Sequence, residues 1–363
     1  MYRQAIPTNI TIAPDNILGG VSGDNVCAPI NELTTGHKRI LLNLTYGGNI
    51  FGRGNANAVF YEPDGTSMLA NPSSGSGFAS GLWIIEVSNN TKFIGYMTGM
   101  DSQRSRGGSI RTYTFTDVLQ GWDVLLTNTI YPVSTNPTYT VHSLLNDIVY
   151  SAITASGINL VGDHVPANSM LVSDLYEEGV YSITNSTYLA EIQKICQDLG
   201  YIVFCDTGFG KVTILDPFNP DRDYLDIDED SIIDASYSID YLAMASTVLV
   251  NDDITLKGVA YGHLGTGANR DDLVYNFSKI NNLVFATTFG VKEAKLAGIA
   301  EQLYKIGKNQ SRILTLTKAG DEYSSLCLGS KITWVGGDYT VFEYETTISR
   351  TEYKTVLKGF VSL

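Results

Sequence analysis

The residues of this 363-residue chain best able to bind metal or act as nucleophiles are its four histidines and four cysteines. The histidines stand apart from one another, with no HExxH pattern and no ligand spacing. The cysteines form no CxxC pair, and two of them lie in apolar stretches typical of buried thiols. We therefore expect no metal, no cofactor, no catalytic residue and no enzymatic activity. The eight residues are His37, His142, His164, His263, Cys27, Cys196, Cys205 and Cys327.

One basic cluster, SQRSRGGSIR at residues 102–111, surrounds a glycine turn. Arg104, Arg106 and Arg111 have the chemistry to hold a phosphate or an acidic loop of a neighbouring subunit, because a guanidinium group forms paired hydrogen bonds with either. A solvated hairpin tip explains the same residues equally well. Both interpretations stay open at this point.

Two further stretches resemble ligand loops without completing the pattern. DRDYLDIDED at residues 221–230 has spaced carboxylates but lacks the glycine and the final glutamate of a calcium loop. GHLGTG at residues 262–267 matches neither the dinucleotide nor the phosphate-loop template. We interpret the first as a solvated acidic turn and the second as a glycine-rich loop. A glycosidase carboxylate pair is formed in space, so residue counts do not exclude it.

The charge of the chain is low and acidic. Charged residues make up 17%, against about 25% in an average soluble domain, and the net charge is −14. This composition argues against a protein that grips DNA or an anionic membrane through a general basic surface. We also expect no membrane-spanning helix and no signal peptide, because the sequence contains no long apolar run and no basic leader.

Short strands separated by turn residues are predicted at both ends of the chain. Glycine-, asparagine- and proline-rich turns follow each apolar or alternating run, a pattern typical of a small barrel or sandwich. The predicted strands cover residues 39–47, 58–63, 82–87, 92–100, 109–118, 231–240, 246–251, 312–319, 330–336, 338–349 and 352–363.

Apolar residues at helical spacing predict helices in the middle of the chain. One helix is expected from Thr140, as the N-cap, to Gly157. A second covers residues 185–200, with Ser186 as the cap, and leads into a hairpin at 201–217. A third covers residues 291–307 and ends at a glycine.

These elements predict a β-rich α+β fold in which two β-rich domains, each a small barrel or sandwich, flank a smaller α+β module. The second barrel domain includes the helix 291–306 and an irregular insertion, 252–290. The expected divisions are an N-terminal arm 1–37, a first barrel domain 38–123, an α+β module 124–220 and a second barrel domain 221–363.

Three passages together resemble the bacteriophage tail baseplate hub proteins, whose fold is shared with contractile injection systems. The first is LWIIEV with KFIGYMTGMDSQRSRGGSIRTYTFTDVLQGWDVLL, within residues 82–126. The second is VYSITNSTYLAEIQKICQDLGYIVFCDTGFGKVTI, residues 180–214. The third is the helix and closing strands of residues 291–361. The likeness rests on the order of elements and covers about two thirds of the chain.

The resemblance implies a structural virion component, assembled in the host cytoplasm and located in the tail baseplate. Each of three identical subunits would supply two tube-like domains, forming a homotrimeric, pseudo-six-fold ring between the hexameric tail tube and the trimeric spike. Its partners would be the tail tube protein, the spike protein and other baseplate proteins. DNA would pass through the lumen without specific binding, and Arg104, Arg106 and Arg111 would dock a neighbouring subunit. Because the chain stops where the second barrel should end, we favour a contractile tail.

Two other functions remain as alternatives. A receptor- or glycan-binding tail protein would use tyrosine and tryptophan side chains as sugar platforms. A tail-tip cell-wall hydrolase would need a carboxylate pair or a zinc site in a cleft.

Overall fold

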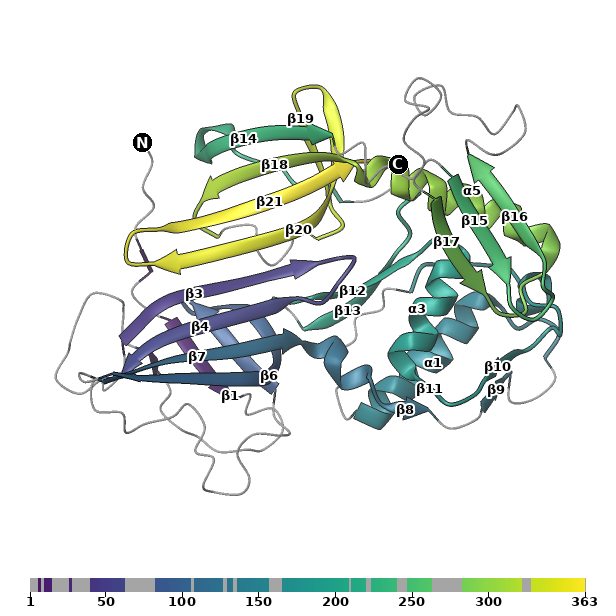
Figure 1. The fold of residues 1–363 in the computed structure, drawn as a ribbon, viewed down its shortest axis with the longest axis horizontal. Coiled ribbons are helices and arrows are strands. Elements are labelled where there is room, and N and C mark those ends of the chain that lie inside the picture. The colour runs from purple at the N-terminus through teal and green to yellow at the C-terminus, as the bar shows by residue number, and fades with distance from the viewer. Residues whose placement is uncertain are drawn as a thin grey trace.

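The structure is a computed structural model, in which two bodies lie side by side (Figure 1). A large curled antiparallel sheet forms one body, and helices with small sheets form the other. The fold is therefore of the β-rich α+β class. The structure describes residues 6–7, 10–14, 26–27, 40–62, 82–105, 108–126, 129–132, 136–156, 165–208, 210–219, 223–239, 247–262, 283–321 and 328–362.

The large sheet contains twelve strands, taken from both ends of the chain. Its order is β14-β18-β21-β20-β3-β4-β7-β6-β5-β1-β2, with β19 paired to β20. The predicted strands in both end segments are confirmed, apart from small shifts at their ends. The bounds are β1 Ile10–Pro14, β2 Val26–Cys27, β3 Ile40–Asn49, β4 Asn55–Glu62, β5 Leu82–Val87, β6 Asn90–Ser105, β7 Gly108–Asp117, β14 Ile232–Ile239, β18 Arg312–Ala319, β19 Lys331–Trp334, β20 Gly337–Ser349 and β21 Tyr353–Val361.

A single strand pair, β3 with β20, joins the N-terminal and C-terminal strands into one sheet. We call this pair the seam. Gly47 lies opposite Glu345 in the seam, and a Cβ atom on Gly47 would lie 2.2 Å from the carbonyl oxygen of Tyr344. The glycine therefore allows the two backbones to approach each other.

One side of the large sheet carries its core. Alternate residues of each strand point to this side, so the β3 pattern of buried and half-buried positions follows the pleat. Aromatic rings fill much of the space. Among them is the edge-to-face pair Phe60 and Tyr113, whose ring centroids are 5.8 Å apart. Leu314, Leu316 and Leu357 bring the C-terminal strands into the same core.

The second body has its own core, built around four helices within the described part of the chain. The helices are α1 Val141–Ser156, α2 Val172–Leu175, α3 Tyr188–Leu199 and α5 Glu293–Gln310. A three-stranded sheet packs against α5 and has the order β16-β15-β17. Its strands are β15 Thr247–Asp252, β16 Gly258–Gly262 and β17 Leu283–Thr288. None of the described helices is both long enough and apolar enough to cross a membrane.

The helix ends follow the predicted signals in part. Thr140 Oγ1 accepts a hydrogen bond from the Ser143 N–H at 3.1 Å, as expected of an N-cap. The second helix begins later than predicted, and Thr187 caps it in place of Ser186. Gly200 ends it with a φ of 69°. The third helix continues through the predicted terminal glycine for three more residues, although its last buried residue is Ile306.

Three segments adopt structures that the sequence pattern did not indicate. The strand predicted at 246–251 exists as β15, but it belongs to the three-stranded sheet of the second body. The expected irregular insertion 252–290 contains β16 and β17 in its described part. β15 and β17 run parallel, and a parallel partner lies far along the chain, where local patterns do not reveal it. Within the expected N-terminal arm, β1 and β2 extend the large sheet.

The predicted hairpin, β12 Ile202–Asp206 with β13 Lys211–Leu215, connects the two bodies (Figure 1). Its turn residue Thr207 shares a hydrogen bond with the buried Tyr344 hydroxyl, and its carbonyl accepts the Ile94 N–H at 2.7 Å. A small apolar cluster of Ile50, Phe204 and Phe360 packs at the same junction. The hairpin therefore fixes the helical body against the large sheet.

In the rest of the second body, short strands and 3-10 turns support the helices. A 3-10 helix, η3 Val118–Trp122, follows β7, and the side chain of Asp117 caps its N-terminus. The remaining elements of this body are β8 Leu125–Leu126, β9 Thr129–Tyr131, β10 Tyr181–Ile183 and β11 Ser186–Thr187. Another 3-10 helix, η4 Glu229–Ser231, directly precedes β14 of the large sheet.

Candidate functional site

The candidate functional surface is the side of the large sheet opposite its core, which we call the polar face. Pairing registers place short uncharged side chains at successive positions of six strands on this side. Such side chains offer hydrogen bonds to water and little net charge. They are Ser236, Ser238, Thr315, Thr317, Thr347, Ser349, Asn43, Thr45, Asn49, Asn55, Asn57, Thr112 and Thr114.

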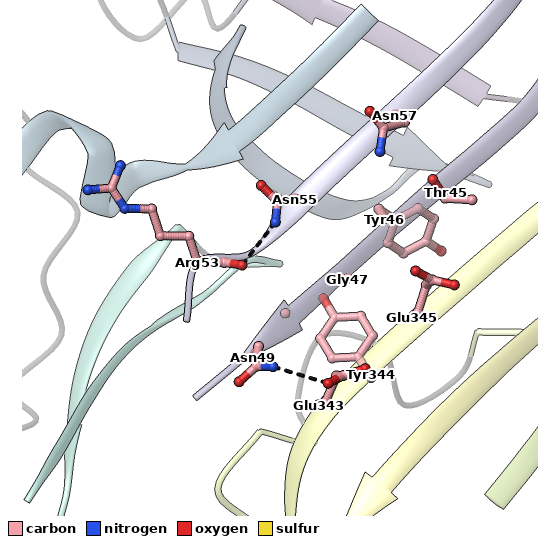
Figure 2. Close-up of a pocket in the computed structure, with 11 residues that line it drawn as sticks. Thr45, Tyr46, Gly47, Asn49, Arg53, Asn55, Asn57, Glu343, Tyr344 and Glu345 are labelled. Atoms are coloured by element: carbon pink, nitrogen blue, oxygen red, sulfur yellow. Dashed lines mark hydrogen bonds between the residues drawn. The ribbon is translucent and has the colours of Figure 1, made fainter. Parts of the chain in front are cut away.

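A hollow of about 180 Å³ lies in the polar face at the seam (Figure 2). Gly47 and Gly48 of β3 help to form it because they carry no side chains. Across the hollow, Asn49 Nδ2 donates a hydrogen bond to Glu343 Oε2 at 3.1 Å. Glu345 lines the same hollow and is exposed.

Both lysines that the registers place on the polar face are paired with glutamates. Lys358 Nζ lies 2.6 Å from Glu343 Oε1, and Lys354 Nζ lies 2.9 Å from Glu352 Oε1. Arg53, at the rim of the hollow, contacts Gln120 and lies 3.4 Å from Asp123 Oδ2. The polar face thus presents hydrogen-bonding groups and few cations available to bind phosphate.

A buried carboxyl group supports the rim of the hollow. Asp117 accepts hydrogen bonds from the N–H groups of Gly54 and Leu119, the latter at 3.1 Å. Burial raises the pKa of Asp117 to about 7, against an ordinary 3.8. Because Asp117 is fully covered, its role is to hold the turn before β4 against η3.

The predicted arginine cluster does not project from a turn as a group. Arg104 on β6 is exposed, whereas Arg111 on β7 is only 7% exposed. The register puts both on the core side of the sheet, where Arg104 pairs with Ser109 and Arg111 pairs with Ser102. Arg106 lies outside the described residues. The strands extend further into the basic stretch than the glycine pattern indicated.

The other candidates for chemistry that the structure describes occupy structural positions, whereas His37, His164, His263 and Cys327 lie outside the described residues. Cys196 and Cys205 are buried and unpaired with each other, and burial raises the pKa of each thiol. His142 contacts the Pro166 carbonyl through Nδ1 at 3.0 Å. Within the described ranges, no group of three or more His, Cys, Asp or Glu residues is placed to hold a metal ion.

The polar face was not predicted from the sequence, although the sequence contains a signal for it. In LLNLTYGGN, asparagine and threonine alternate with apolar residues, which indicated a strand with one buried side. The polar sides of these strands form one surface because β3 pairs with β20, which lies near the other end of the chain. A local sequence pattern does not reveal such a distant pairing.

No family model matches this chain, and no curated protein matches its sequence. Solved structures are similar over nearly its whole length. A tail protein from Neisseria meningitidis MC58 has 9% identity and a TM-score of 0.60, covering 97% of this chain and 96% of that one. The 43 kDa tail protein of prophage MuSo2 from Shewanella oneidensis also has 9% identity and a TM-score of 0.60, covering 97% of each chain.

A third similar structure comes from a secretion system. The E. coli c3393 protein, a component of the type VI secretion system, is described as structurally similar to the T4 bacteriophage tail proteins gp27 and gp5. It has 12% identity to this chain and a TM-score of 0.51, covering 91% of this chain and 76% of its own. This chain therefore has the fold of phage tail proteins. The resemblance predicted from the sequence is confirmed at the level of the fold.

Proposed function

We propose that this chain is a non-enzymatic hub of a phage tail baseplate, or of a phage-like injection machine. Three copies form a pseudo-six-fold ring that joins the hexameric tail tube to the trimeric spike. The two strand sets on either side of the seam serve as the two tube-like domains of each subunit. The tail proteins of similar fold support a role in a tail, and the hub role is our more specific inference.

The polar face is the observation that carries this proposal. In the ring, it lines the bore through which DNA moves. A passage for DNA must hydrate the duplex without holding its phosphates, because each phosphate contact with a free lysine or arginine adds affinity. Threonine, asparagine and serine provide the hydration, and the glutamate partners of Lys354 and Lys358 reduce the attraction for phosphate.

The free edge of the large sheet supports association between subunits. β14 ends the sheet, and nearly all of its side chains are exposed. Ile233 is 58% exposed and Tyr237 is 50% exposed, although Tyr237 lies on the core side beside Leu314. An open edge with an uncovered apolar side is a liability in a monomer and is covered in a permanent assembly.

The mass and symmetry of the purified chain test the proposal. We expect three copies by native mass spectrometry, and a ring with apparent six-fold symmetry in electron micrographs when tail tube protein is added. Tyr237→Lys should weaken the trimer, because it places a charge on the uncovered side of β14. Leu256→Asn alters an exposed apolar residue in the turn between β15 and β16 of the second body, and should leave the trimer intact. A stable monomer that binds neither tube nor spike protein contradicts the proposal.

A further inference from the structure

The loop between β15 and β16, residues 253–257, presents two large aliphatic side chains to solvent. Ile254 is 67% exposed and Leu256 is 87% exposed. The exposed Phe289 lies beside them, because a Cβ atom on the next residue, Gly290, would be 3.3 Å from Ile254 Cδ1. We call Ile254, Leu256 and Phe289 the apolar tip. Single exposed apolar residues are common on protein surfaces, so the backbone and the surroundings of the tip decide whether it has a role.

Leu256 has a backbone conformation that is unfavourable for leucine. Its φ is 57°, in the left-handed region, where Cβ crowds the backbone. The other described non-glycine residues in this region are Ser88, Asn89, Asn185 and Val335, of which the first three are small polar residues typical of turns. Leu256 and Val335 are also the two most exposed large apolar side chains in the described part of the chain. Asparagine or glycine at position 256 would remove both costs, so folding of this loop does not require a leucine.

The buried Asp252 holds the loop in this shape. Its Oδ1 accepts hydrogen bonds from the N–H groups of Ile254 and Thr255, at 3.1 and 2.7 Å, and its Oδ2 accepts one from the Val291 N–H at 2.9 Å. The Leu256 N–H donates to the Asp252 carbonyl at 2.9 Å. A loop that is already fixed loses little conformational entropy when it docks, so the apolar tip is preorganised for binding.

Carboxylates without cation partners surround the apolar tip. Asp253, Glu177 and Glu178 are exposed, and none of them belongs to an ion pair within the described ranges. Backbone hydrogen bonds place two of them beside the tip. The Glu177 N–H donates to the Gly290 carbonyl at 2.7 Å, and the Asp253 N–H donates to the Thr288 carbonyl at 3.1 Å.

Three lysines near the apolar tip are already engaged. Lys257 pairs with Glu293. Lys194 Nζ lies 4.3 Å from the centre of the aromatic ring in the tip and 3.1 Å from Glu191 Oε1. Lys292 is half-buried and donates to a backbone carbonyl at 2.7 Å. The rim of the tip therefore has an excess of negative charge, which basic side chains on a partner would complement.

We propose that the apolar tip docks into an apolar pocket with a basic rim on a neighbouring protein other than a copy of this chain. Ile254 and Leu256 enter the pocket, while the carboxylates of Asp253, Glu177 and Glu178 face lysines or arginines around it. The three-stranded sheet that carries the loop lies at the opposite end of the molecule from β3, β4 and β7 (Figure 1), so the tip is free when the large sheet contacts other copies. An anionic membrane fits less well, because these carboxylates repel it. The inference rests on the proposed function in one respect, that the chain belongs to a particle of several proteins.

Photocrosslinking in assembled particles tests the contact directly. The full chain carries the change Leu256→p-benzoylphenylalanine. After irradiation we expect a crosslink to a different protein of the particle, in an apolar segment flanked by lysine or arginine, as located by mass spectrometry. The matched control is the same photoreactive group at Leu125, which is 68% exposed on β8 and should not crosslink to that segment. A crosslink from position 256 only to other copies of the chain, or no crosslink at all, contradicts the proposal.

Leu256→Asn separates docking from folding. Asparagine adopts the left-handed conformation more readily, so this variant should melt about 1–3 °C above the native chain. Its affinity for the protein identified by crosslinking should nevertheless fall by about 10- to 100-fold, because an apolar anchor is lost. Leu125→Asn should leave that affinity unchanged. Equal affinities of the native chain and Leu256→Asn would overturn the proposal.

The basic rim of the partner has its own test. Glu177→Gln combined with Glu178→Gln should slow association with the crosslinked protein and weaken the dependence of the association rate on salt. An association rate that these two changes leave unaltered at low salt would show that the partner's rim is not basic.

Liposomes of phosphatidylcholine and phosphatidylglycerol test a lipid surface as the partner. The native chain should not sediment with them, and sedimentation that Leu256→Asn abolishes would assign the apolar tip to a membrane and overturn the proposal. Failure here is distinguishable from failure of the hub proposal. A normal trimer whose tip crosslinks to nothing refutes the docking of the tip alone, whereas a monomer whose tip crosslinks to another tail protein refutes the ring alone.

Discussion

Asp321 lies at the centre of a buried polar cluster that closes the interior of the large sheet. The hydroxyl groups of Tyr46 and Tyr353 donate to its two oxygens, the first at 2.6 Å. Lys92 Nζ, from β6, lies 3.2 Å from Asp321 Oδ2. Lys92 and Asp321 are each only 8% exposed, so neither charge has bulk water as an alternative partner. The cluster links both strand sets through side chains, in addition to the seam.

Asp321→Ala should lower the free energy of unfolding by about 3–5 kcal/mol, because it leaves the Lys92 charge buried without its partner. Urea denaturation followed by tryptophan fluorescence measures the change. The matched control is Glu352→Ala, which breaks the exposed pair with Lys354 and should cost at most about 1 kcal/mol. An equal loss of unfolding free energy in the two variants would show that the buried cluster stabilises the fold no more than an exposed ion pair does.

Asp117 makes stability depend on pH. Its pKa is about 7 in the folded chain and 3.8 ordinarily, so the folded state holds the proton more tightly. The resulting stabilisation is fully present below about pH 4 and is lost as the pH rises to about 7. As the pH rises from 4 to 7, the unfolding free energy of the native chain should therefore fall relative to that of the Asp117→Asn variant. The slope of this difference should be at most about 1.4 kcal/mol per pH unit. A difference between the two that stays constant from pH 4 to pH 7 would contradict this account.

At the scale of elements, the seam depends on a glycine. Gly47→Ala places a methyl group 2.2 Å from the Tyr344 carbonyl oxygen, so β3 and β20 must move apart. We expect a loss of about 2 kcal/mol or more in stability, since backbone strain and lost ladder hydrogen bonds add together. Chemical denaturation measures the loss.

Gly52→Ala is the control for the seam variant, because its Cβ would meet only Asn49 Cγ, at 3.9 Å. It should change stability by less than about 1 kcal/mol. A similar loss in both variants would mean that glycine flexibility, and not close approach at the seam, explains the effect.

Sequence patterns located elements well where the signal is local. The hairpin 201–217 and the strand 312–319 were predicted correctly, because turn residues and alternation lie within each segment. The helix cap moved from Ser186 to Thr187, since adjacent residues have equal capping chemistry. The parallel partner of β15 and the seam between β3 and β20 were not predictable, because both pairings join distant segments.

At the scale of the whole molecule, the proposed bore can be converted into a surface that holds DNA. Changing Glu343 and Glu352 to glutamine removes the partners of Lys358 and Lys354. The ring that we propose should then retain short duplex DNA at low salt in a gel-shift assay, and should lose it steeply as the salt concentration rises. The ring formed by the native chain should not retain it.

A charge-matched control separates position from net charge in the DNA assay. Glu301→Gln and Glu293→Gln together remove the partners of Lys305 and Lys257 in two exposed pairs of α5. These two changes should leave DNA binding absent. If the α5 variant retained DNA as well as the polar-face variant did, the polar face would have no particular relation to the bore.

The seam also has a consequence for how each subunit is made. Asn49 and Glu343 meet across it although 294 residues separate them along the chain. During translation, one edge of β3 stays unpaired until β20 has left the ribosome, and such distant pairing is slow to form. The sheet that would contact other subunits is therefore complete only after β20 and β21 have been made. Fragments of the chain that lack β20 and β21 cannot form the complete sheet. The order of the strands should therefore prevent incomplete chains from assembling with other subunits.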